Sequence, residues 1–145
     1  MTPSGAHTLQ TYVKEVLVYP ADIQSSMIQY PSQDGTPIKA SFSRPTASGR
    51  YPGVVVIMEA FGLNDHIKDV ARRFAEQGYC ALAPDMYSRE GSPDPTVMDQ
   101  VLKTMFSVPD AQAVADLEGA ITYLKGLPEA NGKVGAIGTF ALTRI

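Results

Sequence analysis

Short apolar runs separated by longer amphipathic stretches set the pattern of this chain. Three such runs occupy residues 54–58, 79–83 and 133–137. Continuous apolar, β-branched runs of this length are typical of strands buried on both faces of a parallel sheet. We therefore predict three buried strands with helices between them.

The first amphipathic stretch predicts a helix that begins at Asn64 or Asp65, either of which can cap it. Gly78 follows the last apolar position and is expected to end the helix. The apolar positions recur at helical spacing and form one stripe: Ile67, Val70, Ala71, Phe74 and Ala75.

Two further helices are predicted before the third run. A short helix is expected over 96–106, and residues 107–110 have capping-box spacing with a proline in the first turn of the next helix. That longer helix ends near Gly126 and carries one apolar stripe: Val114, Leu117, Ile121 and Leu124.

The segment before residue 54 predicts a β-hairpin. Runs at 27–30 and 37–42 flank the dipeptide Asp34-Gly35, which is a strong hairpin signal. Residues 12–19 are compatible with one more strand, and residues 1–11 are expected to be flexible. The order is a hairpin followed by β-α-β-α-α-β, which predicts an α/β fold with a mainly parallel sheet flanked by helices. At 145 residues we expect a single domain, 1–145.

Composition excludes several classes of function. The net charge of −3 and the absence of Lys/Arg clusters argue against nucleic-acid and membrane partners. No apolar run approaches the ~18 residues that a membrane span needs, and the polar N-terminus resembles no secretory signal. A single cysteine, Cys80, rules out an internal disulfide and agrees with a reducing compartment. We expect a cytoplasmic protein.

Several joined segments resemble the dienelactone hydrolase (carboxymethylenebutenolidase) family of the α/β-hydrolase superfamily. They span 58–64, 65–75, 78–87, 116–124 and 132–135, in the family's order. The resemblance covers about residues 20–138. It implies hydrolysis of a small ester or lactone by a Cys nucleophile, a His base and an Asp, with no metal or organic cofactor.

The resemblance also assigns site residues. Glu59 matches a carboxylate that hydrogen-bonds the resting thiol and manages its proton. The Ala60 amide matches one oxyanion donor, and Ala141, after the nucleophile position, matches the second. From the residues alone, a loop carboxylate bonded to backbone amides is the favoured interpretation of Glu59, and the resemblance reverses it; for Ala60 the alternative is an ordinary turn amide.

Arg89 matches an arginine that contacts the substrate carboxylate, so the resemblance allows an anionic substrate. A solvated surface arginine is the alternative, and the neighbouring Tyr87 is expected simply to pack. Three other residues with reactive side chains are not expected to take part in catalysis. His66 opens a helix and is not the family's base, Cys80 is a buried core residue, and Asp85 forms a turn or cap.

The nucleophile position departs from the family. The elbow pattern G-x-nucleophile-x-G places Phe140 where a Cys should stand, and Leu142 and Thr143 occupy positions where the family has glycine. Phe140 has no lone pair with which to attack, and no matching Asp or His follows. We therefore expect hydrolase ancestry but no competence in this chain, as in a truncation with a foreign tail or a shifted reading frame.

Two alternatives remain open beside an inactive hydrolase. The chain could be a non-catalytic α/β module that binds a small carboxylate or a protein partner, or a structural remnant without function. In the complete family fold, 133–137 is a central strand. Here it would lie at the sheet edge, so we also expect self-association through this strand.

Overall fold

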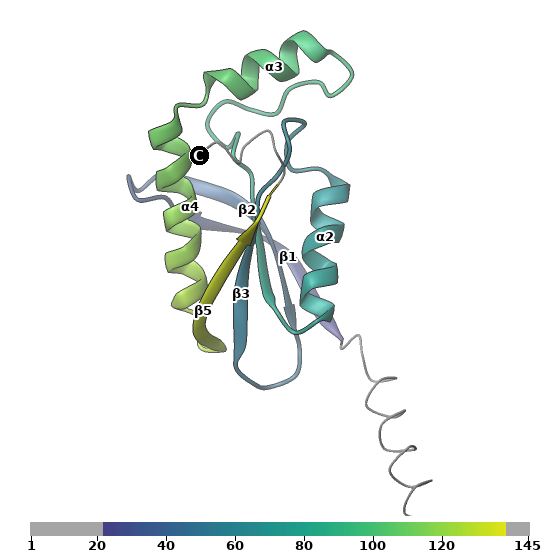
Figure 1. Cartoon of the computed structure of the whole chain (residues 1–145), viewed down its shortest axis with the longest axis vertical. Coiled ribbons are helices and arrows are strands. Elements are labelled where there is room, and N and C mark those ends of the chain that lie inside the picture. Colours follow the sequence, from purple (N-terminus) through teal and green to yellow (C-terminus); the bar gives the residue numbers. More distant parts are fainter. Residues whose placement is uncertain (1–21, 139–145) are drawn as a thin grey trace, which may run out of the picture.

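The computed structural model describes residues 22–138, so the strand predicted at 12–19 and the flexibility predicted for residues 1–11 lie outside it. These residues form a five-stranded sheet of order β1-β2-β4-β3-β5 with three helices (Figure 1). The strands are β1 (Ile23–Pro31), β2 (Pro37–Pro45), β3 (Tyr51–Val56), β4 (Cys80–Pro84) and β5 (Ala130–Ile137), and the helices are α2 (Asp65–Glu76), α3 (Met98–Ser107) and α4 (Asp110–Lys125).

The predicted hairpin is confirmed, with longer strands than the apolar runs suggested. β1 and β2 pair antiparallel from Ile23↔Pro45 to Pro31↔Pro37. Gly35 supplies the left-handed backbone of the turn at φ +85°. The turn therefore positions Asp34 at the end of the hairpin.

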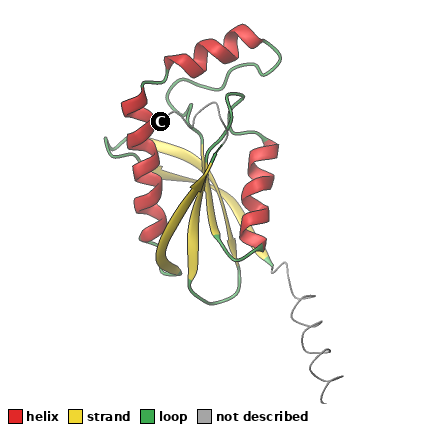
Figure 2. Ribbon diagram, in the orientation of Figure 1, coloured by secondary structure: helices red, strands yellow, loops and turns green. Residues whose placement is uncertain are grey.

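The predicted α/β architecture is also confirmed. β2 joins β4 antiparallel, whereas β4, β3 and β5 run parallel to one another. Helices α2 and α4 cover opposite faces of the sheet (Figure 2). The loops after β3 and β4 therefore emerge together at the carboxyl ends of the parallel strands, where α/β proteins bind their ligands.

The side chains of alternate β3 residues point into two separate hydrophobic cores, one on each face of the sheet. Val54 and Val56 pack with Ile67 and Ala71 beneath α2, whereas Val55 packs with Leu124 beneath α4. Every residue of β4 is buried. The continuous apolar runs at β3 and β4 thus reflect burial on both faces, as predicted.

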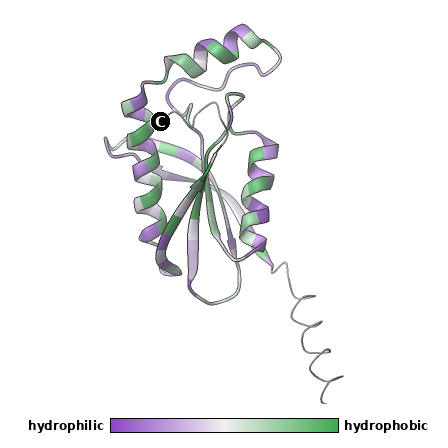
Figure 3. Ribbon diagram, viewed as in Figure 1, coloured by the Kyte–Doolittle hydropathy of each residue, from purple (hydrophilic) through white to green (hydrophobic). Residues whose placement is uncertain are grey.

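Helix α2 follows its sequence signals. The side chain of Asn64 accepts a hydrogen bond from the Ile67 amide, so Asn64 rather than Asp65 is the cap. Gly78 adopts φ +96° just beyond the helix. Polar and apolar colours alternate along this helix, as expected for one face on the core (Figure 3).

The start of α4 differs from the prediction. Pro109 is the N-cap and supplies no side-chain bond, while the Ser107 hydroxyl donates to the Thr104 carbonyl within α3. The predicted capping box is therefore wrong, because α3 extends through Ser107 and leaves that side chain facing its own helix.

The buried face of α4 is also rotated from the predicted stripe. Val114 is 37% exposed. The positions that are buried are Ala113, Asp116, Gly119, Ala120 and Leu124. The shift arises because Gly119 and Asp116, rather than large apolar residues, face the hairpin.

β5 is a strand but not a buried one, which corrects the prediction for 133–137. It pairs with β3 alone among the described residues, and Ile137 remains 45% exposed. Its apolar composition does not reflect burial, because the strand lies at the edge of the described sheet. The Asn131-Gly132 turn is a bulge, in which the Asn131 side chain accepts from the Lys133 amide.

Candidate functional site

The Glu59–Gly62 turn lies just beyond β3 and presents the Ala60 amide. The Glu59 carbonyl accepts a hydrogen bond from the Gly62 amide at 3.1 Å, and Gly62 has φ +99°. In a planar trans peptide the Ala60 N–H points opposite to the Glu59 carbonyl. This amide therefore faces away from the inside of the turn, as an oxyanion donor must.

Tyr87 holds the same turn from the loop after β4. Its hydroxyl donates to the Ala60 carbonyl at 2.8 Å, and the ring is 1% exposed. Burial raises the pKa of Tyr87 to about 12, so the hydroxyl stays protonated as a donor. The sequence predicted only packing for this residue, whereas the structure adds an ordering bond to the turn.

The end of β5 lies directly beside the segment that leads to Glu59. The Ile57 amide donates to the Ile137 carbonyl at 2.8 Å. A Cβ on Gly138 would stand 3.0 Å from the Ile57 Cβ, so this position requires a glycine unless Ile57 shifts. The point at which the chain leaves β5 therefore lies beside Ile57, which precedes Glu59 by two residues in the sequence.

The Glu59 carboxylate has no hydrogen bond or ion pair with any residue between 22 and 138. Its side chain is half-buried. The alternative of a carboxylate bonded to backbone amides is thus not what the described residues show. Phe140 and Ala141, the nucleophile position and the second oxyanion donor of the resemblance, lie outside the described residues.

Arg89 is engaged by two carboxylates rather than by solvent. Its Nη1 donates to both carboxylate oxygens of Asp116, at 2.7 and 3.0 Å. Its Nη2 donates to both oxygens of Asp34, at 2.9 and 3.1 Å. The cluster ties the loop after β4 to α4 and to the hairpin turn.

Neither Asp34 nor Asp116 was singled out for this site from the sequence. The available signal was a carboxylate on the apolar face of α4, since a buried charge requires a partner. Asp116 is fully buried, and the Tyr30 hydroxyl donates to its carbonyl at 2.8 Å. Burial, with the charge of Asp116, raises the pKa of Tyr30, which therefore remains a donor.

The structure places Asp85, His66 and Cys80 as expected for residues outside a catalytic site. The Asp85 carboxylate accepts from the Tyr87 amide in a turn, and burial raises its pKa. His66 is exposed at the second position of α2. Cys80 is 2% exposed in β4, and burial raises its pKa to about 11, so it is a poor nucleophile near neutral pH.

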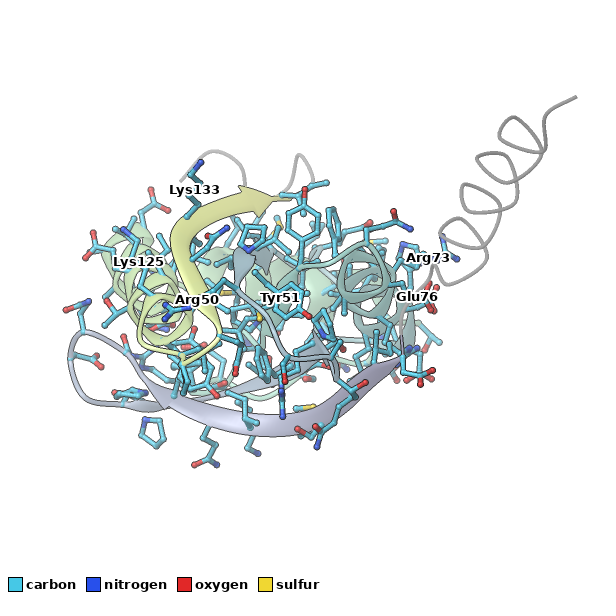
Figure 4. All side chains as sticks on the ribbon, turned by 90° about the horizontal axis from the view of Figure 1, so that it is seen from below. Arg50, Tyr51, Arg73, Glu76, Lys125 and Lys133 are labelled. Atoms are coloured by element: carbon cyan, nitrogen blue, oxygen red, sulfur yellow. The ribbon has the colours of Figure 1, made fainter. Side chains whose placement is uncertain are left out.

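A groove of about 450 Å³ runs between α2 and β5, but it is not built around these residues. Phe74, Tyr79 and 133–137 contribute most of its lining, and Glu59, Ala60 and Arg89 do not line it. Arg50, Lys125 and Lys133 lie around the start of β5, at the end of the sheet away from the Glu59–Gly62 turn (Figure 4).

Metal and membrane features are also absent from the described part. No cluster of three or more His, Cys, Asp or Glu side chains within residues 22–138 is arranged to hold a metal ion. None of the helices described there is long and apolar enough to cross a membrane.

Comparison with known proteins shows which family the chain resembles in sequence and fold. A carboxymethylenebutenolidase of Pseudomonas putida is 32% identical over 117 residues, which cover 77% of this chain and 49% of that protein. A provisionally named carboxymethylenebutenolidase of Methylorubrum extorquens is 42% identical over 106 residues, covering 72% of this chain and 36% of that one. The chain thus spans half or less of these relatives.

Solved structures lead to the same family. A provisionally named dienelactone hydrolase of Klebsiella pneumoniae superposes with a TM-score of 0.71 at 35% identity, over 81% of this chain and 50% of that one. A dienelactone hydrolase-like promiscuous phosphotriesterase from metagenomic libraries gives 0.68 at 33% identity, over 84% and 54%. The family model matches residues 38–140. This chain belongs to the dienelactone hydrolase family.

Proposed function

We propose that this chain carries one half of an ester- or lactone-hydrolysing site: a proton partner, Glu59, and one oxyanion donor, the Ala60 amide. Membership of a hydrolase family supports the reaction class. The observation that carries the proposal is the hydrogen bond from the Ile57 amide to the Ile137 carbonyl, at 2.8 Å. It brings the Glu59–Gly62 turn to the point where the chain leaves β5 toward the nucleophile position.

The chemistry of such a half-site follows from its groups. When a nucleophile held near the end of β5 attacks the substrate carbonyl, negative charge develops on the carbonyl oxygen. The Ala60 N–H can stabilise that charge. Glu59, half-buried and without a partner among residues 22–138, is placed to accept the proton of a neighbouring nucleophile. The Tyr87 hydroxyl donates to the Ala60 carbonyl and so helps to hold the turn that presents the Ala60 N–H.

The 145-residue chain should not complete the reaction, because Phe140 cannot attack a carbonyl. Steady-state hydrolysis of 4-nitrophenyl acetate and of a dienelactone tests this. We expect rates equal to those of the buffer and of the Cys80→Ala variant. Turnover that Cys80→Ala abolishes would contradict both the buried assignment of Cys80 and the half-site proposal.

A non-catalytic module that binds a carboxylate through Arg89 is a less favoured second candidate. Both terminal nitrogens of Arg89 already bond carboxylates of this chain. The contacts of Arg89 therefore favour a structural role for it over an open anion site.

A further inference from the structure

The two nitrogens of Arg89 face carboxylates of very different exposure. Asp116, on Nη1, has a side chain that is 1% exposed. Asp34, on Nη2, is 55% exposed, and the Arg89 side chain itself is 20% exposed. One partner is thus part of the core, and the other lies at the surface.

This difference in exposure decides which of the two carboxylates an external anion could replace at Arg89. Separating Arg89 from Asp116 would leave a buried carboxylate without a counter-charge, which is strongly unfavourable. Separating Arg89 from Asp34 returns an exposed carboxylate to water, which solvates it, so this pair is easily broken. An external anion can therefore reach Arg89 only on the Asp34 side.

Asp34 cannot move far when it is displaced. Its Oδ1 accepts the Thr36 amide at 2.9 Å, which closes the hairpin turn. The hydrogen bonds from Thr36, followed by the charge of Arg89, hold the pKa of Asp34 below its usual range, so it stays charged at neutral pH. A displaced Asp34 would remain beside the incoming anion and repel it.

We infer that Asp34 is a specificity residue that occupies the outer edge of Arg89 and disfavours small carboxylate ligands there. The inference rests on the proposed function, because it concerns which esters the half-site would take: an anionic ester that used Arg89 would have to displace Asp34, whereas a neutral ester would not. Arg89 with its two carboxylates already carries one more negative than positive charge.

The test compares two matched variants. Asp34→Asn removes the charge but keeps an oxygen for the Thr36 amide. Asp94→Asn is the control, because the Thr96 amide bonds the Asp94 Oδ1 at the same 2.9 Å in a turn that has no arginine partner among residues 22–138. Both variants change the net charge by the same amount.

The probe is maleate, a small dicarboxylate without an ester bond, titrated into the ¹⁵N-labelled 145-residue chain and followed by NMR at the Arg89 side chain and the Thr36 amide. We expect Asp34→Asn to bind maleate at least about fivefold more tightly than the unaltered chain, and Asp94→Asn to match the unaltered chain. The neutral diamide maleamide should bind all three alike.

Three results would overturn the inference: no maleate binding by Asp34→Asn, equal affinity in Asp34→Asn and the unaltered chain, or an equal gain in Asp94→Asn. The last would attribute the effect to net charge alone. None of these bears on the half-site proposal, which is tested with a neutral ester and a nucleophile.

Discussion

The Arg89 guanidinium neutralises the buried carboxylate of Asp116 through hydrogen bonds of 2.7 and 3.0 Å. Arg89→Met should lower the free energy of unfolding by about 3–5 kcal/mol in urea denaturation, because Asp116 would be left charged in the core. Arg44→Met is the control, since within the described part of the chain Arg44 bonds only the exposed Gln24 side chain, at 3.0 Å.

If Arg89→Met fails to fold, a second substitution at Asp116 still tests the prediction. The double variant Arg89→Met/Asp116→Leu removes the buried charge and should recover most of the lost stability. If Arg89→Met is no more destabilising than Arg44→Met, the pair does not stabilise the junction of α4 and the hairpin.

Gly119 permits the close approach of α4 to the hairpin. A Cβ at this position would lie 2.6 Å from the Pro31 carbonyl oxygen and 3.0 Å from the Ser32 Cα. These are backbone atoms, so Gly119→Ala should destabilise the chain by about 1–3 kcal/mol despite the better helix propensity of alanine. Gly135→Ala, whose Cβ would meet open space, should change stability far less in the same urea titration.

The Cys80 thiol should make stability fall at alkaline pH. Burial raises its pKa from 9.0 to about 11. The unfolded chain therefore loses the proton first, so the contribution is complete below pH 9 and disappears as the pH rises toward 11. Urea unfolding at pH 8 to 11 should show a smaller decline for Cys80→Ala than for the unaltered chain. Equal declines would mean that the thiol titrates normally in the fold.

The outer edge of β5 should pair two copies of the 145-residue chain. Among the described residues this strand has a neighbour on one side only, and exposed strand edges pair with other chains. Sedimentation velocity at tens of micromolar should show dimers or larger species, and Ile137→Lys should reduce them. Leu102→Lys, at an exposed apolar position on α3, is the control. A single monomeric species for the unaltered chain would contradict this prediction.

The elements that the sequence predicted best are those with local signals. Continuous apolar runs marked β3 and β4, Asp34-Gly35 marked the hairpin, and Asn64 marked the start of α2. The exposure of β5 was harder to predict from its run alone, because an apolar composition does not state how many neighbours a strand has.

The site was predictable only in part, for a related reason. Resemblance located Glu59, Ala60 and Arg89, but not the partners that decide what Arg89 does. Asp34 and Asp116 lie 55 and 27 residues from Arg89 in the chain, so only the tertiary fold brings the three together. The bond from Tyr87 to Ala60 spans 27 residues and was missed for the same reason.

The most direct test of the half-site supplies the missing nucleophile. Phe140→Cys, made in the Cys80→Ala background, is mixed with excess 4-nitrophenyl acetate, and the release of nitrophenol is followed by stopped flow. We expect a burst of about one equivalent without sustained turnover, slowed at least about tenfold by Glu59→Gln. Glu76→Gln, which removes the same charge at the C-terminal end of α2, should leave the burst rate unchanged (Figure 4). A thiol that reacts no faster than one in an unfolded peptide, or equal burst rates in Glu59→Gln and Glu76→Gln, would contradict the account.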